Sequence, residues 1–340
     1  MNTTIVGVDL ATKAIQVCVY ARSKVQSNKE LTPQQFSEFL RQQSPSIVVF
    51  ESCSGSNYWS QVSRSLGHEA KLISTRLVMA IRQNQKTDRN DALAIVQAAL
   101  LPDIHFVSSK TPQQQQAQAI LRLREQCIKQ KTALRNQLAG LLREFNFQVG
   151  RGESKLISTI ELILEDAENG LSVSFRAMLN KSLSLYQQIC VTLESYNTAL
   201  EEWVINTPDC RKLMKIEGIG LLNAIYLYIV IADQELGEFK QGRDVSACIG
   251  LIPVQHSSGG KVKLGTIGKR KNTSLRSLLI TGSMSVIQQV EKREAKSKKE
   301  SWLKALIERR GKKCAAVALA NKNVRTAFAM LKNGTDYQLN

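Results

Sequence analysis

Histidine, proline and paired cysteines are scarce in this sequence. Its 340 residues include only 3 His, and none of its 7 Cys belongs to a Cys-x-x-Cys pair. A zinc site or a disulfide framework needs such ligands at short spacing, so neither is expected to organise the fold. With 6 Pro, 19 Gly and 43% hydrophobic residues, the chain can bury sizeable cores and is not disordered throughout. We expect its mostly apolar-flanked thiols to be reduced.

Long apolar runs are missing as well. The longest one extends from Leu221 to Ala232 and contains Asn223, which is well short of the roughly 20 residues that a membrane-spanning helix needs. The first residues lack a basic segment, and Asp9 falls where a signal peptide would still be apolar. We therefore expect a cytoplasmic protein with no membrane segment.

Acidic residues are outnumbered. The sequence has 46 Lys and Arg against 29 Asp and Glu, which gives a formal charge of +17. The excess is concentrated late in the chain, where residues 261–332 hold 19 basic and 4 acidic residues. Such a density favours a polyanion through phosphate contacts and counterion release. Nucleic acid is therefore the expected partner. The alternative is a basic face kept for solubility, although such faces usually mix both signs.

The first 108 residues alternate short apolar runs with helical patterns. Two β-rich runs at 3–10 and 15–21 are close enough for a hairpin, and two further strands are predicted at 47–50 and 70–73. Helical patterns cover 33–40, 58–66 and about 87–100. This order predicts an α/β domain with a mixed sheet.

From residue 111 onward the pattern is that of long helices. Apolar residues recur at steps of three and four, at Leu134, Leu138, Leu141 and Phe145 and then at Tyr186, Ile189, Leu193, Tyr196, Leu200 and Trp203. This spacing predicts two antiparallel helices with coiled-coil seams, joined within 150–170. A hairpin this long has faces left over, which favours a homo-oligomer. We divide the chain into an α/β domain at 1–108, a helical region at 109–206 and a basic, mainly helical domain at 207–340.

Four carboxylates occupy positions that could bring them together. Asp9 ends the first apolar strand, Glu51 follows the strand at 47–50, and Asp88 and Asp91 share one helix face. Acids at the carboxyl ends of parallel strands face the ligand crevice of such a sheet. Carboxylate oxygens with no His or Cys nearby select Mg²⁺ or Mn²⁺, and a pair of these ions can clamp a phosphodiester. Each acid also has a structural explanation. Asp9 fits a turn residue, Glu51 fits the ion-pair partner of a lysine, and Asp88 fits a helix N-cap whose first turn Asp91 supports.

Seven short blocks resemble those of a known enzyme family. Three lie early in the chain: Gly7-Val8-Asp9-Leu10-Ala11, Phe50-Glu51-Ser52 and Lys86-Thr87-Asp88-Arg89-Asn90-Asp91-Ala92. Four follow in the basic third: Lys215 to Gly220, Ile249 to Pro253, Ser257 to Gly260, and Ile267 to Arg276. In order and spacing they resemble the insertion-sequence-110 family of transposases, and the pattern is most similar to its eleven-eleven branch.

The resemblance implies a RuvC-like DEDD domain of the RNase H-like fold, in which Asp9, Glu51, Asp88 and Asp91 bind Mg²⁺ or Mn²⁺. It implies a C-terminal transposase domain whose serine attacks DNA and forms a covalent phosphoserine link, with Ser257 and Ser258 both candidates. It also implies a structured non-coding guide RNA, a bridge RNA, that pairs with the element's end and with the target DNA. A homo-oligomer, dimer or tetramer, would take the acids from one protomer and the serine from another.

Without the resemblance, the residues of the basic third are compatible with more than one structure and function. The Lys215 to Gly220 block has the form of a helix-hairpin-helix turn, where Gly218 and Gly220 let backbone N–H groups approach a phosphate, but a glycine turn between core helices explains it equally well. Ser-Gly pairs are common in turns, so the serines alone predict a flexible loop. The cations expected to contact phosphates are Lys261, Lys263, Lys269, Arg270, Lys271 and Arg276. The 6% aromatic content fits backbone contacts better than base reading.

We therefore expect a DNA recombinase that moves an insertion sequence. A site-specific invertase of the same family would use the same chemistry. A RuvC-like nuclease or junction resolvase would use water in place of serine and would cut without becoming attached to DNA. A basic nucleic-acid-binding scaffold would tolerate loss of all four acids.

Overall fold

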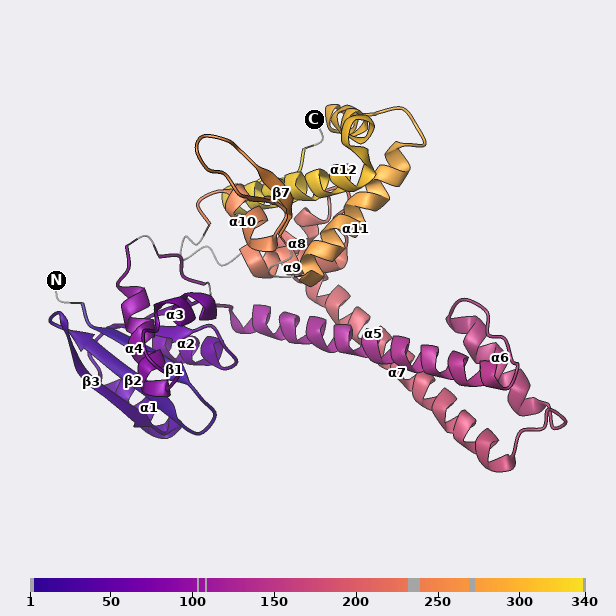
Figure 1. The fold of residues 1–340 in the computed structure, drawn as a ribbon, viewed down its shortest axis with the longest axis horizontal. Helices are drawn as coiled ribbons and strands as arrows, with labels where there is room; N and C mark the ends of the chain where they lie inside the picture. The colour runs from indigo at the N-terminus through magenta and orange to yellow at the C-terminus, as the bar shows by residue number, and fades with distance from the viewer. Residues whose placement is uncertain (1–2, 103, 108, 232–238, 269–272, 339–340) are drawn as a thin grey trace. The chain divides into compact units, whose positions relative to one another are not determined.

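The computed structural model describes residues 3–102, 104–107, 109–231, 239–268 and 273–338 (Figure 1). The chain forms two compact units. One comprises residues 1–114, 229–276 and 321–335, and the other comprises residues 115–228, 277–320 and 336–340. Within the described residues, no helix is both long and apolar enough to cross a membrane.

A five-stranded mixed sheet forms the N-terminal part of the first unit. Its strands lie in the order β3 (Lys24–Leu31), β2 (Ile15–Ala21), β1 (Ile5–Leu10), β4 (Ile47–Glu51) and β5 (Glu69–Ile73). Strand β2 pairs antiparallel with both β1 and β3, whereas β4 pairs parallel with β1 and β5 pairs parallel with β4. The predicted opening hairpin and mixed sheet are confirmed. The polar, largely exposed β3 forms one edge, as expected for an edge strand.

Helices cover both faces of this sheet. On one face, α1 (Pro33–Gln42) and α2 (Ser56–Ser65) pack against a core that includes Val6, Val8 and Phe50. On the other, α3 (Thr75–Ile81) and α4 (Asp88–Ala99) pack against a core that includes Ile5 and Val49. The two cores follow from the alternation of side chains along β1 and β4. The helix expected at about 87–100 is confirmed as α4, whereas the seven-residue α3 was not predicted, because it is too short to show a period.

Three helices, rather than the expected two, build the helical middle. These are α5 (Pro112–Glu144), α6 (Glu153–Glu165) and α7 (Val173–Ile205), and their shared core includes Leu138, Leu142, Ile160 and Leu183. Within one chain the buried face of α5 departs from the predicted seam at its end, because Leu141 is exposed and Leu142 is fully buried. Since α6 packs beside the last turns of α5, the buried face passes through Leu138 and Leu142, which lie one turn apart.

The basic third is mainly helical. Its elements are α8 (Pro208–Leu213), α9 (Leu221–Ile231), α10 (Gly242–Ile249), β6 (Pro253–Gln255), β7 (Leu264–Ile267), α11 (Thr273–Val290) and α12 (Lys298–Asn333). In the second unit, Ile287 of α11 packs against Leu303 and Leu319 of α12. The two parts of α12 meet at Gly311, whose φ of 78° interrupts the helix. In the first unit, Asn321 of α12 donates a hydrogen bond to the Leu251 carbonyl at 3.2 Å, just after α10.

Candidate active site

Asp9 and Glu51 lie at the ends of neighbouring parallel strands. Strands β1 and β4 pair with Val8 opposite Phe50, so each acid comes directly after a member of this pair. Because side chains alternate along a strand, Asp9 shares a face with Ile5, and Glu51 shares one with Val49. Both apolar residues belong to the core beneath α3 and α4. The two half-buried carboxylates therefore lie on the helix-covered face at the carboxyl ends of the strands.

Gly7 allows α4 to approach this face closely. A Cβ atom built on Gly7 would lie 2.6 Å from Val96 Cγ2 and 2.7 Å from the Ala92 carbonyl oxygen. Real Cβ atoms do not come this close to backbone oxygens, so α4 can sit at this depth only over glycine. The first turn of α4, one turn before Ala92, therefore lies near the end of β1.

Asp88 and Asp91 both belong to that first turn. Thr87 is the N-cap of α4, and its hydroxyl accepts a hydrogen bond from the Asn90 N–H at 3.3 Å. The capping role that we considered for Asp88 thus belongs to Thr87. Asp88 is exposed, whereas Asp91 is buried with 6% of its surface exposed. A buried aspartate must have a partner, because an isolated charge is costly away from water.

Three of the candidate carboxylates act electrostatically on the fourth, Asp9. Burial, followed by the charges of Asp91, Glu51 and Asp88, raises the pKa of Asp9 to about 6, and Lys86 opposes this rise. Groups from two strands and one helix thus act on a single carboxyl. In the part of the chain that the structure describes, however, no three acidic, cysteine or histidine side chains are arranged as a ready metal site.

Arg82 is the partner of Asp91, and sequence reasoning missed it. Its Nη1 donates to Asp91 Oδ1 at 2.7 Å, and the two side chains are 18% and 8% exposed. Arg82 follows the last residue of α3, so the ion pair joins the end of α3 to the first turn of α4. Arg82 lies just after α3 and Asp91 lies in α4, and no periodic pattern relates them. Only the folded chain reveals the pair.

The serine motif forms the tip of the β6–β7 hairpin. Gly259 and Gly260 have φ values of 56° and 74°, and the Lys261 N–H donates to the Ser258 carbonyl at 3.1 Å. Two consecutive positive φ angles are typical of a type I′ turn, which matches the twist of paired strands and favours glycine at both positions. The segment is thus a defined hairpin tip, in contrast to the flexible loop that the serines alone predict.

The two candidate serines differ in their hydrogen bonds. Ser257 Oγ accepts from Gln255 Nε2 at 2.8 Å and from the Lys263 N–H at 3.2 Å. The Ser258 hydroxyl has no hydrogen-bond partner among the described residues. Both serines are exposed. Within the described ranges, no hydrogen bond or ion pair connects this hairpin to the four acids.

The predicted glycine turn lies between α8 and α9, and it is packed on one side only. Gly218 has a φ of 84°, and a Cβ atom on Gly282 of α11 would lie 2.1 Å from the Gly218 carbonyl oxygen. The two backbones are therefore in direct contact. A Cβ atom on Gly220, just before α9, would meet nothing within 4 Å. The turn is fixed against α11 at Gly218 and open at Gly220.

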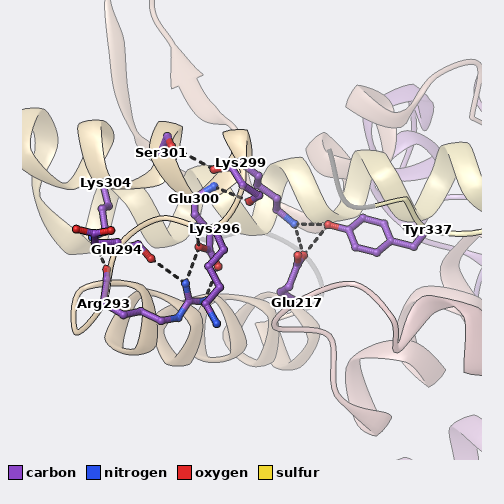
Figure 2. Close-up of polar contacts among 10 residues, drawn as sticks. Glu217, Arg293, Glu294, Lys296, Lys299, Glu300, Ser301, Lys304 and Tyr337 are labelled. Atoms are coloured by element: carbon purple, nitrogen blue, oxygen red, sulfur yellow. Dashed lines mark hydrogen bonds and ion pairs between the residues drawn. The ribbon is translucent and has the colours of Figure 1, made fainter.

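Charged residues beside this turn hold it in place, as Figure 2 shows. Glu217 accepts hydrogen bonds from Lys299 Nζ and from the Tyr337 hydroxyl, both at 2.6 Å, and Lys299 also donates to Tyr337 at 3.0 Å. Burial favours the neutral carboxyl, but these hydrogen bonds outweigh it and lower the pKa of Glu217. Nearby, the Arg293 guanidinium binds both carboxylate oxygens of Glu300. Sequence reasoning did not find this network, which ties the turn to α12 and to the residues after it.

The structure describes only some of the other side chains that are expected to contact phosphates. Lys261 and Lys263 are exposed on the serine hairpin. Arg276, in the first turn of α11, donates to the Gly268 carbonyl oxygen. Lys269, Arg270 and Lys271 lie outside the described residues.

Comparison with known proteins connects both ends of the chain to one family. A family profile described as "Transposase" matches residues 6–147, and one described as "Transposase IS116/IS110/IS902 family" matches residues 210–300. A protein of Coxiella burnetii named "Transposase for insertion sequence element IS1111A" is 36% identical over 98% of this chain and 91% of its own length. A "Probable family 20 transposase" of Pseudomonas aeruginosa is 33% identical over 99% of each chain. The IS1328 transposase of Yersinia enterocolitica is 30% identical over 98% of each.

Proposed function

Because the chain belongs to the IS116/IS110/IS902 family and is an insertion-sequence transposase, we propose that it cuts and rejoins DNA with divalent metal ions held by Asp9, Glu51, Asp88 and Asp91. One observation carries the proposal. Acids from two parallel strands and from the first turn of α4 act together on the pKa of Asp9, which indicates that they share one region. A structural role for each acid separately would not require this convergence.

The donor set fits Mg²⁺ or Mn²⁺. All four candidates offer carboxylate oxygens, the hard ligands that these ions prefer. Burial, and after it the negative charges of the other three acids, raises the pKa of Asp9, and a bound dication would favour its ionised form. When bound, such ions stabilise the charge that develops on a phosphodiester and on its leaving oxygen.

Ser258 is the better candidate for the nucleophile. A hydroxyl oxygen has two lone pairs, and in Ser257 the donors Gln255 and Lys263 engage both. Ser258 has its lone pairs available at an exposed hairpin tip. In the proposed step its oxygen bonds to phosphorus, its proton passes to solvent, and the bond from phosphorus to the leaving DNA oxygen breaks. The resulting phosphoserine ester conserves the bond energy, so a DNA hydroxyl can rejoin the strand without ATP.

The basic third would hold the nucleic acids. We assign phosphate contacts to the backbone at Gly220, on the open side of the turn, and Gly218 supports the conformation of that turn. The side chains that we expect to contact phosphates are Lys261, Lys263, Lys269, Arg270, Lys271 and Arg276. These contacts read backbone rather than sequence. Recognition of the element ends and of the target would then rest on pairing with a structured guide RNA, in agreement with the low aromatic content.

A homo-oligomer, dimer or tetramer, would complete the site. Large apolar side chains on α7 are exposed, among them Val173, Val191 and Ile205 at 85%, 61% and 64%. Partner helices bury such residues. We propose that the acids of one protomer act with the serine of another.

The metal role can be tested with Glu51→Gln, which removes one ligand charge and preserves shape. Incubated with Mg²⁺ and a labelled DNA that carries the element end, this variant should cut at least about 100-fold more slowly than wild type, with DNA affinity unchanged. Glu69→Gln is the matched control, because Glu69 lies on β5 of the same sheet and pairs with Lys71 at the surface. Cleavage by Glu51→Gln at the wild-type rate would refute the metal role.

A further inference from the structure

The ion pair between Arg82 and Asp91 occupies a place that the proposed function assigns to a metal ion. Asp91 is the most buried of the four acids, and one of its oxygens already accepts the Arg82 guanidinium at 2.7 Å. The other three acids have no ion pair among the described residues. In the described part of the chain, the one cation that forms an ion pair with this cluster thus binds its least accessible member.

Both ends of the ion pair are held by the backbone. The Arg82 N–H donates to the Val78 carbonyl at 3.0 Å and thereby ends α3, while the Asp91 N–H donates to the Thr87 carbonyl at 2.9 Å within the first turn of α4. The Arg82 side chain is only 18% exposed, so water screens the pair weakly. A held, poorly screened guanidinium places a fixed positive charge beside the carboxylate.

We propose that Arg82 and the divalent ion compete for Asp91, so that Arg82 sets the metal affinity of the acid cluster. This inference rests on the proposed metal role of the four acids. A dication bound to Asp91 would lie about 2 Å from a carboxylate oxygen, while the guanidinium stands at hydrogen-bond distance from the same group. The two cations repel each other across a short, partly buried gap. This repulsion drives Arg82 away from Asp91 when metal binds, and removal of Arg82 strengthens metal binding.

The competition also gives Arg82 a structural role. With Arg82 removed and no metal bound, Asp91 is left as a buried carboxylate without a cationic partner, which is costly. Chelated protein should therefore lose stability when Arg82 is replaced. Saturating metal should restore it, because the dication then takes the place of the guanidinium.

The test uses the full chain, first stripped of metal with a chelator and then titrated with Mn²⁺ in a calorimeter. Arg82→Gln should bind Mn²⁺ about tenfold more tightly than wild type, because a nearby positive charge is gone. Its chelated form should unfold at a lower temperature, and Mn²⁺ should raise that temperature more than in wild type. Arg76→Gln, which removes an exposed arginine from the same helix α3, is the matched control and should behave as wild type.

Equal or weaker Mn²⁺ binding by Arg82→Gln would overturn the inference. Asp9→Asn separates this failure from failure of the proposed function. If Asp9→Asn binds Mn²⁺ like wild type, the acid cluster is not the metal site and both ideas fall. If Asp9→Asn loses binding while Arg82→Gln does not gain it, only the competition is wrong.

A measurement on the wild-type chain decides the matter if Arg82→Gln does not fold. The Arg82 Nε–H signal in ¹⁵N NMR spectra is assigned through its loss in Arg82→Lys. It should shift as Mg²⁺ is added, and the midpoint of this shift should coincide with the midpoint of Mg²⁺ binding. A signal that stays unchanged at saturating Mg²⁺ would show that the guanidinium keeps Asp91 throughout, and this would overturn the inference.

Discussion

Gly7 of β1 lies directly beneath Ala92 of α4, so close that a Cβ atom on Gly7 would stand 2.7 Å from the Ala92 carbonyl oxygen. This contact sets the depth of α4 over the sheet. The first turn of α4 carries Asp88 and Asp91, and β1 ends with Asp9. The separation between the strand-end acids and the helix acids thus depends on a residue that takes no part in the chemistry.

Gly7→Ala should weaken both the fold and the metal site. The added methyl would also meet Val96 Cγ2 at 2.6 Å, and because one obstacle is backbone, α4 must shift. We expect a loss of about 1–3 kcal/mol in the free energy of unfolding and weaker Mn²⁺ binding. The matched control is Gly140→Ala in α5, where a Cβ meets nothing within 4 Å and the change should be neutral or stabilising by up to about 1 kcal/mol. Unaltered Mn²⁺ binding by Gly7→Ala would show that the depth of α4 does not matter for the site.

Gly218 and Gly220 should respond differently to alanine. Gly218→Ala forces a side chain into a left-handed conformation against the Gly282 carbonyl at 2.9 Å, so the chain should lose stability. Gly220→Ala meets open space and should leave the melting temperature unchanged. If the backbone at Gly220 approaches a phosphate, as proposed, its added methyl should still weaken DNA or RNA binding in a filter or gel-shift assay. Full affinity in Gly220→Ala would assign the turn a purely structural role.

The raised pKa of Asp9 predicts that this carboxylate destabilises the chelated protein at neutral pH. Its folded pKa of about 6 lies above the ordinary value of 3.8. The stability linked to its proton is therefore complete below about pH 4 and is lost as the pH rises through about 6. In chelator at pH 7.5, Asp9→Asn should melt at a higher temperature than wild type, and the gain should fade as the pH falls toward 4. A gain that does not depend on pH, or a loss of stability, would contradict this account of the cluster.

The sheet and the long helices could be predicted from the sequence because their signals are local. The alternation of side chains in β1 and the apolar run before Glu51 define the strands, and the parallel pairing of β1 with β4 then brings Asp9 and Glu51 to one edge. The caps of helices are equally local, although Thr87 rather than Asp88 turned out to be the cap of α4.

Contacts between elements could not be predicted in the same way. Arg82 meets Asp91 because the loop after α3 turns back toward α4, and Glu217 meets Lys299 and Tyr337 across more than 80 residues of sequence. The sequence predicts only a connection between α5 and α7 within 150–170, where the structure has a third helix, α6. Its apolar residues, Ile160 among them, redirect the buried face of α5 from Leu141 to Leu142.

If a serine of this chain attacks DNA with the help of metal ions held by the four acids, the protein becomes covalently attached to one DNA end. A denaturing gel reveals this attachment, run with wild type, Ser257→Ala, Ser258→Ala and Glu51→Gln, each incubated with Mg²⁺, guide RNA and end-labelled element DNA. A labelled band that migrates with the protein should persist in wild type and Ser257→Ala and be absent from Ser258→Ala and Glu51→Gln. Cleavage at the normal rate in Ser258→Ala, with no protein-linked DNA in wild type, would contradict the account and identify water as the nucleophile.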